Sequence, residues 1–182
     1  MKVGIVGASG AVGLEIIKIL QERNFKISEL NLFSSKRSAG KFIKFRGKKI
    51  IIKELKSSLL KNLDLIFFSA GSTISKKYGM IAAKNNCFVI DNSSAFRMKK
   101  NVPLVVPEVN SEVLEKHNNI ISNPNCSTIQ MALILKPLHD EYKIKRVIVS
   151  TYQAVSGAGK ASEDELFNQT KDYLSGKKII PK

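Results

Sequence analysis

The chain has 182 residues, of which 43% are hydrophobic and 25% charged, and it carries a formal net charge of +15. This length and hydrophobic content predict one or two small globular domains, because the chain is long and apolar enough to bury a hydrophobic core. There is no run of about 18 or more apolar residues, and the amino terminus lacks the basic and apolar segments of a secretory leader. We therefore expect a cytoplasmic protein without a membrane partner.

The positive charge is spread along the chain. Lysine greatly outnumbers arginine, and the densest basic run covers only residues 36–49. We interpret the charge as a solvated basic surface and expect no nucleic-acid partner, although clustered cations can also neutralise phosphates. The two cysteines, Cys87 and Cys126, are far apart and form no C-x-x-C pair, so we expect neither a disulfide framework nor a metal site.

The amino-terminal segment has the strand, loop, helix and strand pattern of a parallel α/β unit. Residues 2–6 form an apolar strand pattern, a glycine-rich loop follows, and residues 11–22 have the apolar period of a helix. Residues 29–33 are the next predicted strand. We expect one buried face on the helix, formed by Val12, Ile16, Ile17, Ile19 and Leu20.

Strand and helix patterns continue to alternate along the chain. Strands are predicted at residues 41–55 (two strands around Arg46-Gly47-Lys48), 63–69, 87–90, 119–122 and 146–152. Helices are predicted at residues 74–86, 111–117, 126–142 and 161–174, with Gly176 as the cap of the last one and a turn-rich stretch at residues 91–109. This order predicts an α/β fold with a Rossmann-type, doubly wound parallel sheet.

Three glycines lie between the first strand and the first helix at G-x-x-G-x-x-G spacing. Glycine permits a tight turn here, and the backbone N–H groups at the start of the helix can bind a pyrophosphate. We therefore predict a dinucleotide site, although such a loop can also serve only as a tight turn. The residues expected to bind the cofactor are Gly7, Ser9, Gly10, Ala11, Val12 and Gly13.

The end of the second strand indicates which nicotinamide cofactor binds. An acidic residue there accepts hydrogen bonds from a ribose 2′-hydroxyl, whereas a basic residue accommodates a 2′-phosphate. No acid follows Phe33, since the next residues are Ser34-Ser35-Lys36-Arg37-Ser38. Arg37 can bind a phosphate through two hydrogen bonds and Ser35 and Ser38 can donate to it, so NADP is favoured over NAD. A solvated basic loop is the alternative.

Cys126 follows Asn123-Pro124-Asn125 and begins the predicted helix of residues 126–142. The unsatisfied N–H groups and the dipole at a helix amino terminus stabilise an anion, so this position favours the reactive thiolate. Asn125 can donate a hydrogen bond to the oxyanion that forms when the thiolate attacks a carbonyl. We expect Cys126 to be a nucleophile and Cys87, on an apolar strand, to be a small buried side chain.

Seven motifs follow one another along nearly the whole chain: GASGAVG, SSKRSAGK, FFSAGS, DNSSAFRM, PLVVPEVN, SNPNCSTIQM and VSTYQAVSGAG. Their order and spacing resemble those of the aspartate-semialdehyde dehydrogenase family. The resemblance implies an NADP-binding Rossmann domain at residues 1–125. It implies the start of an α+β catalytic and dimerisation domain, incomplete here, at residues 126–182. It also implies a homodimer or homotetramer for the full-length protein.

The resemblance implies an NADPH-dependent enzyme of lysine, threonine, methionine and diaminopimelate biosynthesis. Such an enzyme converts 4-aspartyl phosphate to aspartate 4-semialdehyde and phosphate through a thioester on Cys126. By the same resemblance, Gln153 orients the substrate and Arg97 binds the phosphate. The residues implied at the NADP site are Ser9, Gly10, Ala11, Val12, Arg37, Ser38, Ser156 and Gly157. A surface ion pair for Arg97 and a local backbone partner for Gln153 are the alternatives.

Two parts of the family's catalytic machinery have no counterpart in these residues. The family's acid/base histidine and a substrate-binding arginine lie downstream of TYQAVSGAG. His117 and His139 lie outside the matching motifs, so we expect both on the surface. We therefore expect this chain to be part of a longer enzyme, and to fold poorly and show no turnover alone. A non-catalytic NADP-binding module is one alternative. The related N-acetylglutamyl-phosphate reductase is another, which the NPNCST sequence disfavours.

Overall fold

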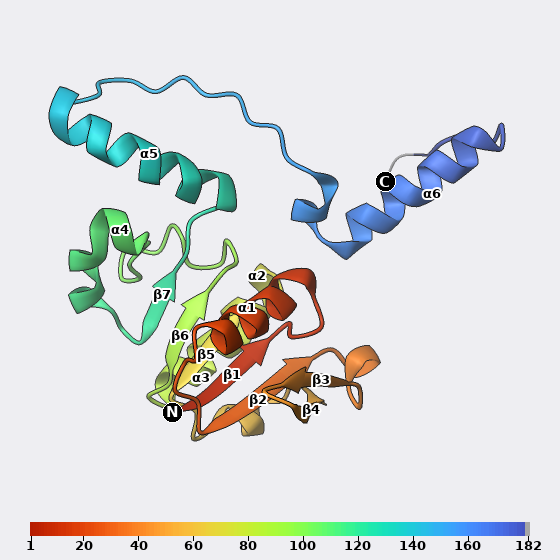
Figure 1. Cartoon of the computed structure of the whole chain (residues 1–182), viewed down its shortest axis with the longest axis horizontal. Coiled ribbons are helices and arrows are strands. Elements are labelled where there is room, and N and C mark those ends of the chain that lie inside the picture. Colours follow the sequence, from red (N-terminus) through yellow and green to blue (C-terminus); the bar gives the residue numbers. More distant parts are fainter. Residues whose placement is uncertain (181–182) are drawn as a thin grey trace. The chain divides into compact units, whose positions relative to one another are not determined.

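The computed structural model describes residues 1–180, and the chain divides into two compact units, Met1–Lys143 and Ile144–Lys182. The first unit contains a seven-stranded, mostly parallel sheet with connecting helices (Figure 1). Within residues 1–180, no helix is both long and apolar enough to span a membrane.

The strand order of the sheet is β3-β4-β2-β1-β5-β6-β7, and every described neighbouring pair is parallel except β3 with β4. The chain starts at the centre, crosses to one side and then to the other, which is the doubly wound order, so the predicted fold class is confirmed. The carboxyl ends of the parallel strands therefore meet at one edge. The strands are β1 (Lys2–Val6), β2 (Glu29–Ser34), β3 (Phe42–Phe45), β4 (Lys48–Glu54), β5 (Leu65–Phe68), β6 (Phe88–Asp91) and β7 (Ile120–Ser122).

The predicted hairpin forms, and it has a structural role in the sheet. Arg46 and Gly47 both have positive φ angles, +48° and +78°, as a two-residue turn between antiparallel strands requires. β4 also pairs with β2 in parallel, with Leu32 opposite Ile52. The hairpin therefore forms one edge of the main sheet.

Helical segments connect the strands close to the predicted positions. The segment predicted as one helix at residues 74–86 is built from two short α-helices joined by a π-helical turn. The predicted helix at residues 126–142 is confirmed at both ends. The helical elements of the first unit are α1 (Ala11–Glu22), η1 (Lys36–Ser38), η2 (Ser57–Leu60), α2 (Ser72–Ile74), η3 (Ser75–Gly79), α3 (Met80–Lys84), α4 (Pro107–Asn110), η4 (Ser111–Lys116) and α5 (Cys126–Tyr142).

The core consists of two apolar clusters, because side chains alternate between the two faces of each strand. One cluster includes Ile17 and Leu20 of α1, and the other includes Ala82 of α3. The predicted buried face of α1 is partly wrong, since Val12 and Ile19 are 50% and 40% exposed. The face of α1 that packs on the sheet is formed by residues three and four positions apart: Gly13, Ile16, Ile17 and Leu20. Val12 and Ile19 lie beside this face.

The second unit contains η5 (Val155–Ala158) and α6 (Lys160–Leu174). Gly176 ends α6 as predicted: it has a φ of +70°, its N–H donates to Tyr173 O, and the N–H of Lys177 donates to Asp172 O. The predicted strand at residues 146–152 is wrong, because this stretch has no regular secondary structure. A strand needs a neighbour for its backbone groups, and none of the described residues pairs with this one.

Candidate active site

The glycine loop between β1 and α1 is packed so tightly that side chains are excluded at two positions. A Cβ on Gly7, whose φ is +85°, would overlap the carbonyl oxygen of Ser69, and a Cβ on Gly13 would overlap that of Gly7. The N–H groups of Gly7 and Ala8 both donate to Phe33 O, at 2.9 and 3.1 Å, so the loop is fixed to the end of β2.

The amino end of α1 leaves backbone donors available beside this loop. The first intrahelical bond runs from Leu14 N to Gly10 O at 2.9 Å. Ala11, Val12 and Gly13 precede that bond, so their N–H groups point out of the helix end, where the dipole favours an anion. This arrangement fits the pyrophosphate of a dinucleotide.

Three serine side chains meet between the glycine loop and the end of β2. Ser9 Oγ lies 2.8 Å from Ser34 Oγ and donates to Ser38 Oγ at 3.2 Å. Arg37 is exposed in η1, directly beside Ser38. The structure thus places three predicted residues together and adds Ser34, which the sequence did not single out. Ser34 could have been predicted from its position, because it is the last residue of β2 and lies level with the glycine loop.

Cys126 is exposed and is the first residue of α5. Asn125 caps the helix by accepting a hydrogen bond from Ser127 N at 2.9 Å, and Cys126 Sγ lies 3.8 Å from the same oxygen, Oδ1. Because the cap uses the amide oxygen, the amide nitrogen of Asn125 is the atom directed to other partners. That is the atom which the predicted oxyanion contact needs.

Arg97 is held beside the segment that leads to Cys126. Its Nε donates to Asn123 O at 2.8 Å and its Nη2 donates to Asn92 O at 3.1 Å. No ion pair among the described residues includes this half-buried guanidinium. Two carbonyl groups therefore fix the plane of the guanidinium. Its charge is not neutralised, and its remaining N–H groups can donate hydrogen bonds to an anion.

The other predicted site residues belong to the second unit. A Cβ on Gly157 would overlap Nε2 of Gln153, so the Gln153 side chain folds over this glycine. Ser156 lies in the same short helix, η5. The predicted placement of Gln153 beside Cys126, and of Ser156 and Gly157 beside NADP, stays a prediction.

The comparisons with known proteins identify the family. Residues 2–117 match the NAD binding domain of semialdehyde dehydrogenase, and residues 135–182 match its dimerisation domain. The chain belongs to the semialdehyde dehydrogenase family. Its first unit therefore carries the nicotinamide-dinucleotide-binding domain of that family. The predicted domain division between residues 125 and 126 stays a prediction.

Three relatives of this chain carry the name aspartate-semialdehyde dehydrogenase. It is 52% identical over 181 residues to the aspartate-semialdehyde dehydrogenase of Aquifex aeolicus, covering 98% of this chain and 53% of that one. It is 45% identical to the Vibrio cholerae aspartate semialdehyde dehydrogenase II complexed with ASA, with a TM-score of 0.86, covering 100% of this chain and 55% of that one. The Candida albicans enzyme with NADP is 26% identical, with a TM-score of 0.60, covering 78% of this chain and 47% of that one. The chain thus spans about half the length of these relatives.

The predictions for the two histidines and for Cys87 have different outcomes. His139 is exposed on α5, as predicted, about 20 Å along the helix from Cys126. The surface prediction for His117 is only partly right: the residue is half-buried, its ring packs edge-on against Phe88, and its Nδ1 accepts a hydrogen bond from Asn119 N. Cys87 is buried as predicted, and its burial, with the charge of Asp64, raises the pKa of its thiol to about 12.

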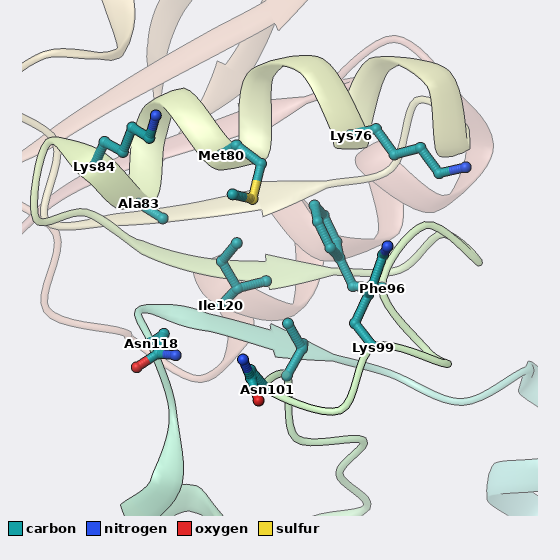
Figure 2. A pocket seen from close by; sticks show the side chains of 10 residues that line it. Lys76, Met80, Ala83, Lys84, Phe96, Lys99, Asn101, Asn118 and Ile120 are labelled. Carbon is teal, nitrogen blue, oxygen red and sulfur yellow. The ribbon is translucent and has the colours of Figure 1, made fainter.

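A cavity of about 680 Å³ lies beside α3 and β7, and it contains none of the predicted site residues (Figure 2). Its apolar wall includes Met80, Phe96 and Ile120, while three lysines, Lys76, Lys84 and Lys99, also line it. In residues 1–180, no group of three His, Cys, Asp or Glu side chains could hold a metal ion.

Proposed function

We propose that the complete polypeptide carrying these residues is an aspartate-semialdehyde dehydrogenase. It reduces 4-aspartyl phosphate to aspartate 4-semialdehyde with release of phosphate, in the synthesis of lysine, threonine, methionine and diaminopimelate. One observation carries the proposal: exposed Cys126 begins α5 only three residues after Asn123, whose carbonyl holds Arg97. The named activity of the relatives supports the choice of substrate.

The proposed mechanism assigns each step to a group of this chain. The Cys126 thiolate attacks the acyl carbonyl, Asn125 donates to the oxyanion through its amide nitrogen, and the carbon–oxygen bond to phosphate breaks, which leaves a thioester. Arg97 binds the phosphate before and after this bond breaks. Gln153 orients the amino-acid part of the substrate. NADPH, when bound, would supply the hydride that reduces the acyl carbon of the thioester. The carbon–sulfur bond then breaks, which releases the aldehyde and returns the Cys126 thiolate.

We infer that the cofactor is NADP, although the domain match itself establishes only a nicotinamide dinucleotide. None of residues 34–38, which follow Phe33, is acidic, and exposed Arg37 adds a positive charge beside Ser38. The nearest carboxylate in register is that of Glu54, opposite Ser34 in β4, and it forms an ion pair with Lys56. Arg37 and the serine hydroxyls suit a 2′-phosphate, and the Candida albicans relative was crystallised with NADP. Arg37→Ala should raise the KM for NADP about tenfold while leaving the KM for NAD nearly unchanged.

The test of the proposed function follows NADPH formation by the complete polypeptide from aspartate semialdehyde and phosphate. Cys126→Ala should reduce turnover at least about a thousandfold, because the thioester forms on this thiol and the other cysteine of the described residues, Cys87, is buried. Cys87→Ala is the matched control and should retain activity. Activity that survives in the Cys126 variant would contradict the mechanism. A preference for N-acetylglutamate semialdehyde would indicate the related reductase, and NADP binding without turnover of either substrate would indicate a non-catalytic module.

The assembly and location of the complete protein are also proposals. Because residues 135–182 match a dimerisation domain, we infer a homodimer or a homotetramer in the cytoplasm. Light scattering of the purified polypeptide measures the subunit number directly. A monomer at micromolar concentration would contradict this inference.

A further inference from the structure

Asp91 is a fully buried acidic residue that has no place in the mechanism above. It is the last residue of β6, at the carboxyl edge of the sheet, and it is 0% exposed. One carboxyl oxygen, Oδ2, accepts a hydrogen bond from Ser93 Oγ at 2.8 Å. The other oxygen, Oδ1, has no hydrogen-bond partner within residues 1–180. Burying a carboxyl group with an unmet acceptor costs free energy, so fold stability alone would favour an apolar residue here.

The polar surroundings of Asp91 extend to the next strand. Ser122 of β7 is its partner in the parallel register, so both side chains lie on the same face of the sheet. Ser122 is also 0% exposed, and its Oγ has no partner among the described residues either. Two adjacent strands thus end in buried polar side chains, just before the segments that contain Arg97 and Cys126 in the sequence. β7 leads into α5 (Figure 1).

Hydrogen bonds through Asp91 and its neighbour join these two segments. The carbonyl oxygen of Asp91 accepts from Asn123 N at 2.9 Å, and the side chain of Asn123 donates to Asn92 Oδ1 at 2.5 Å. On the other side, Ser93 Oγ accepts from Ala95 N at 3.0 Å, which folds the loop back toward the sheet. Arg97 closes the arrangement, since it donates to the carbonyls of both Asn92 and Asn123.

We propose that Asp91 is a positioning residue, which acts through Ser93 to hold the Arg97 guanidinium at the distance from Cys126 that the phosphate of the substrate requires. The inference rests on the proposed function, because it takes Arg97 to be the phosphate ligand. Asp91 itself does not contact the substrate. Its carboxyl group fixes the loop of residues 92–97 on one side, and its backbone carbonyl fixes the segment leading to Cys126 on the other.

The test compares three variants of the complete polypeptide with a matched control. Asp91→Ala removes the acceptor for Ser93, Ser93→Ala removes the same link with less risk to the fold, and Asp91→Asn keeps an acceptor oxygen. Asp64→Ala is the control. Asp64 also accepts a hydrogen bond, from Lys2 N, but it lies at the amino-terminal ends of the strands, away from the ends that carry the site. The readouts are the KM values for phosphate and NADP, and the phosphate concentration that half-protects Cys126 from iodoacetamide.

We expect Asp91→Ala to raise the phosphate KM and the half-protecting concentration about tenfold, and Ser93→Ala to raise both about threefold. The KM for NADP should stay within about twofold in both, and Asp91→Asn should lie close to wild type. Unchanged phosphate values in the two alanine variants, or an equal rise in the KM for NADP together with a lower melting temperature, would overturn the inference. A wild-type protein that phosphate does not protect would instead contradict the proposed function itself.

Discussion

Replacing Gly13 by alanine tests whether the glycine loop is the tight cofactor turn that the site requires. The new Cβ would overlap Gly7 O and lie 2.9 Å from the Cα of Ala8, whereas ordinary contacts lie at 3.4–4 Å. Both neighbours are backbone, so α1 must move away from the loop. Overpacking of this kind costs up to about 3 kcal/mol, while alanine is favoured over glycine in a helix by about 1 kcal/mol. We expect a net loss of about 2 kcal/mol in the free energy of unfolding.

Urea unfolding followed by circular dichroism measures this loss, and cofactor titration measures the effect on binding. The matched control is Gly10→Ala in the same loop. A Cβ at this position would lie 3.3 Å from its nearest neighbour, Gly7 O, and the φ of −83° suits alanine. We expect the control to lose less than about 1 kcal/mol. Dinucleotide affinity should fall by more than tenfold in Gly13→Ala, because the N–H groups of α1 shift. A Gly13→Ala protein as stable as wild type would refute the close packing of α1 on the loop.

Four further predictions concern the cysteines, the helix cap and the chain itself. Iodoacetamide should modify exposed Cys126 and leave buried Cys87 unmodified until the protein unfolds, as peptide mass analysis would show. Because burial raises the pKa of Cys87 from 9.0 to about 12, the folded state holds this proton more tightly than the unfolded state. The contribution of the protonated thiol to the free energy of unfolding is fully present below about pH 9. It falls by up to about 1.4 kcal/mol per pH unit as the pH rises toward 12. Cys87→Ala should remove that slope in urea titrations across the range. Asn125→Ala should cost about 1 kcal/mol of stability through the lost cap, in addition to its effect on turnover. A polypeptide of residues 1–182 alone should show no measurable semialdehyde oxidation, and turnover by it would contradict the expectation that further groups are needed.

Local signals in the sequence were sufficient for the elements whose ends they determine. The glycine spacing located the turn before α1, and the Asn-Cys step located the start of α5, because a cap and its first helical residues interact within one turn. Gly176 was recognisable as the end of α6 for the same reason. These features depend on neighbours in the chain, and a single sequence contains those neighbours.

Features that depend on distant partners could not be predicted in this way. The apolar run at residues 146–152 reads as a strand, but strand pairing requires a second strand that no described residue provides. The exposure of Val12 and Ile19 depends on which side of α1 meets the sheet. His117 is half-buried because Phe88, far away in the sequence, packs against its ring. In each case the prediction failed because the packing partner was unknown.

The anchoring of Arg97 shows why part of the site was hidden even though its motif was visible. Its partners are the carbonyl oxygens of Asn92 and Asn123, and backbone groups leave no signature in side-chain identity. Strand adjacency does predict the pairing, however. β6 and β7 are neighbours in parallel register, and Asp91 and Ser122 are level at their carboxyl ends. The loop after β6 and the segment after β7 must therefore start side by side, which places Arg97 near the approach to Cys126.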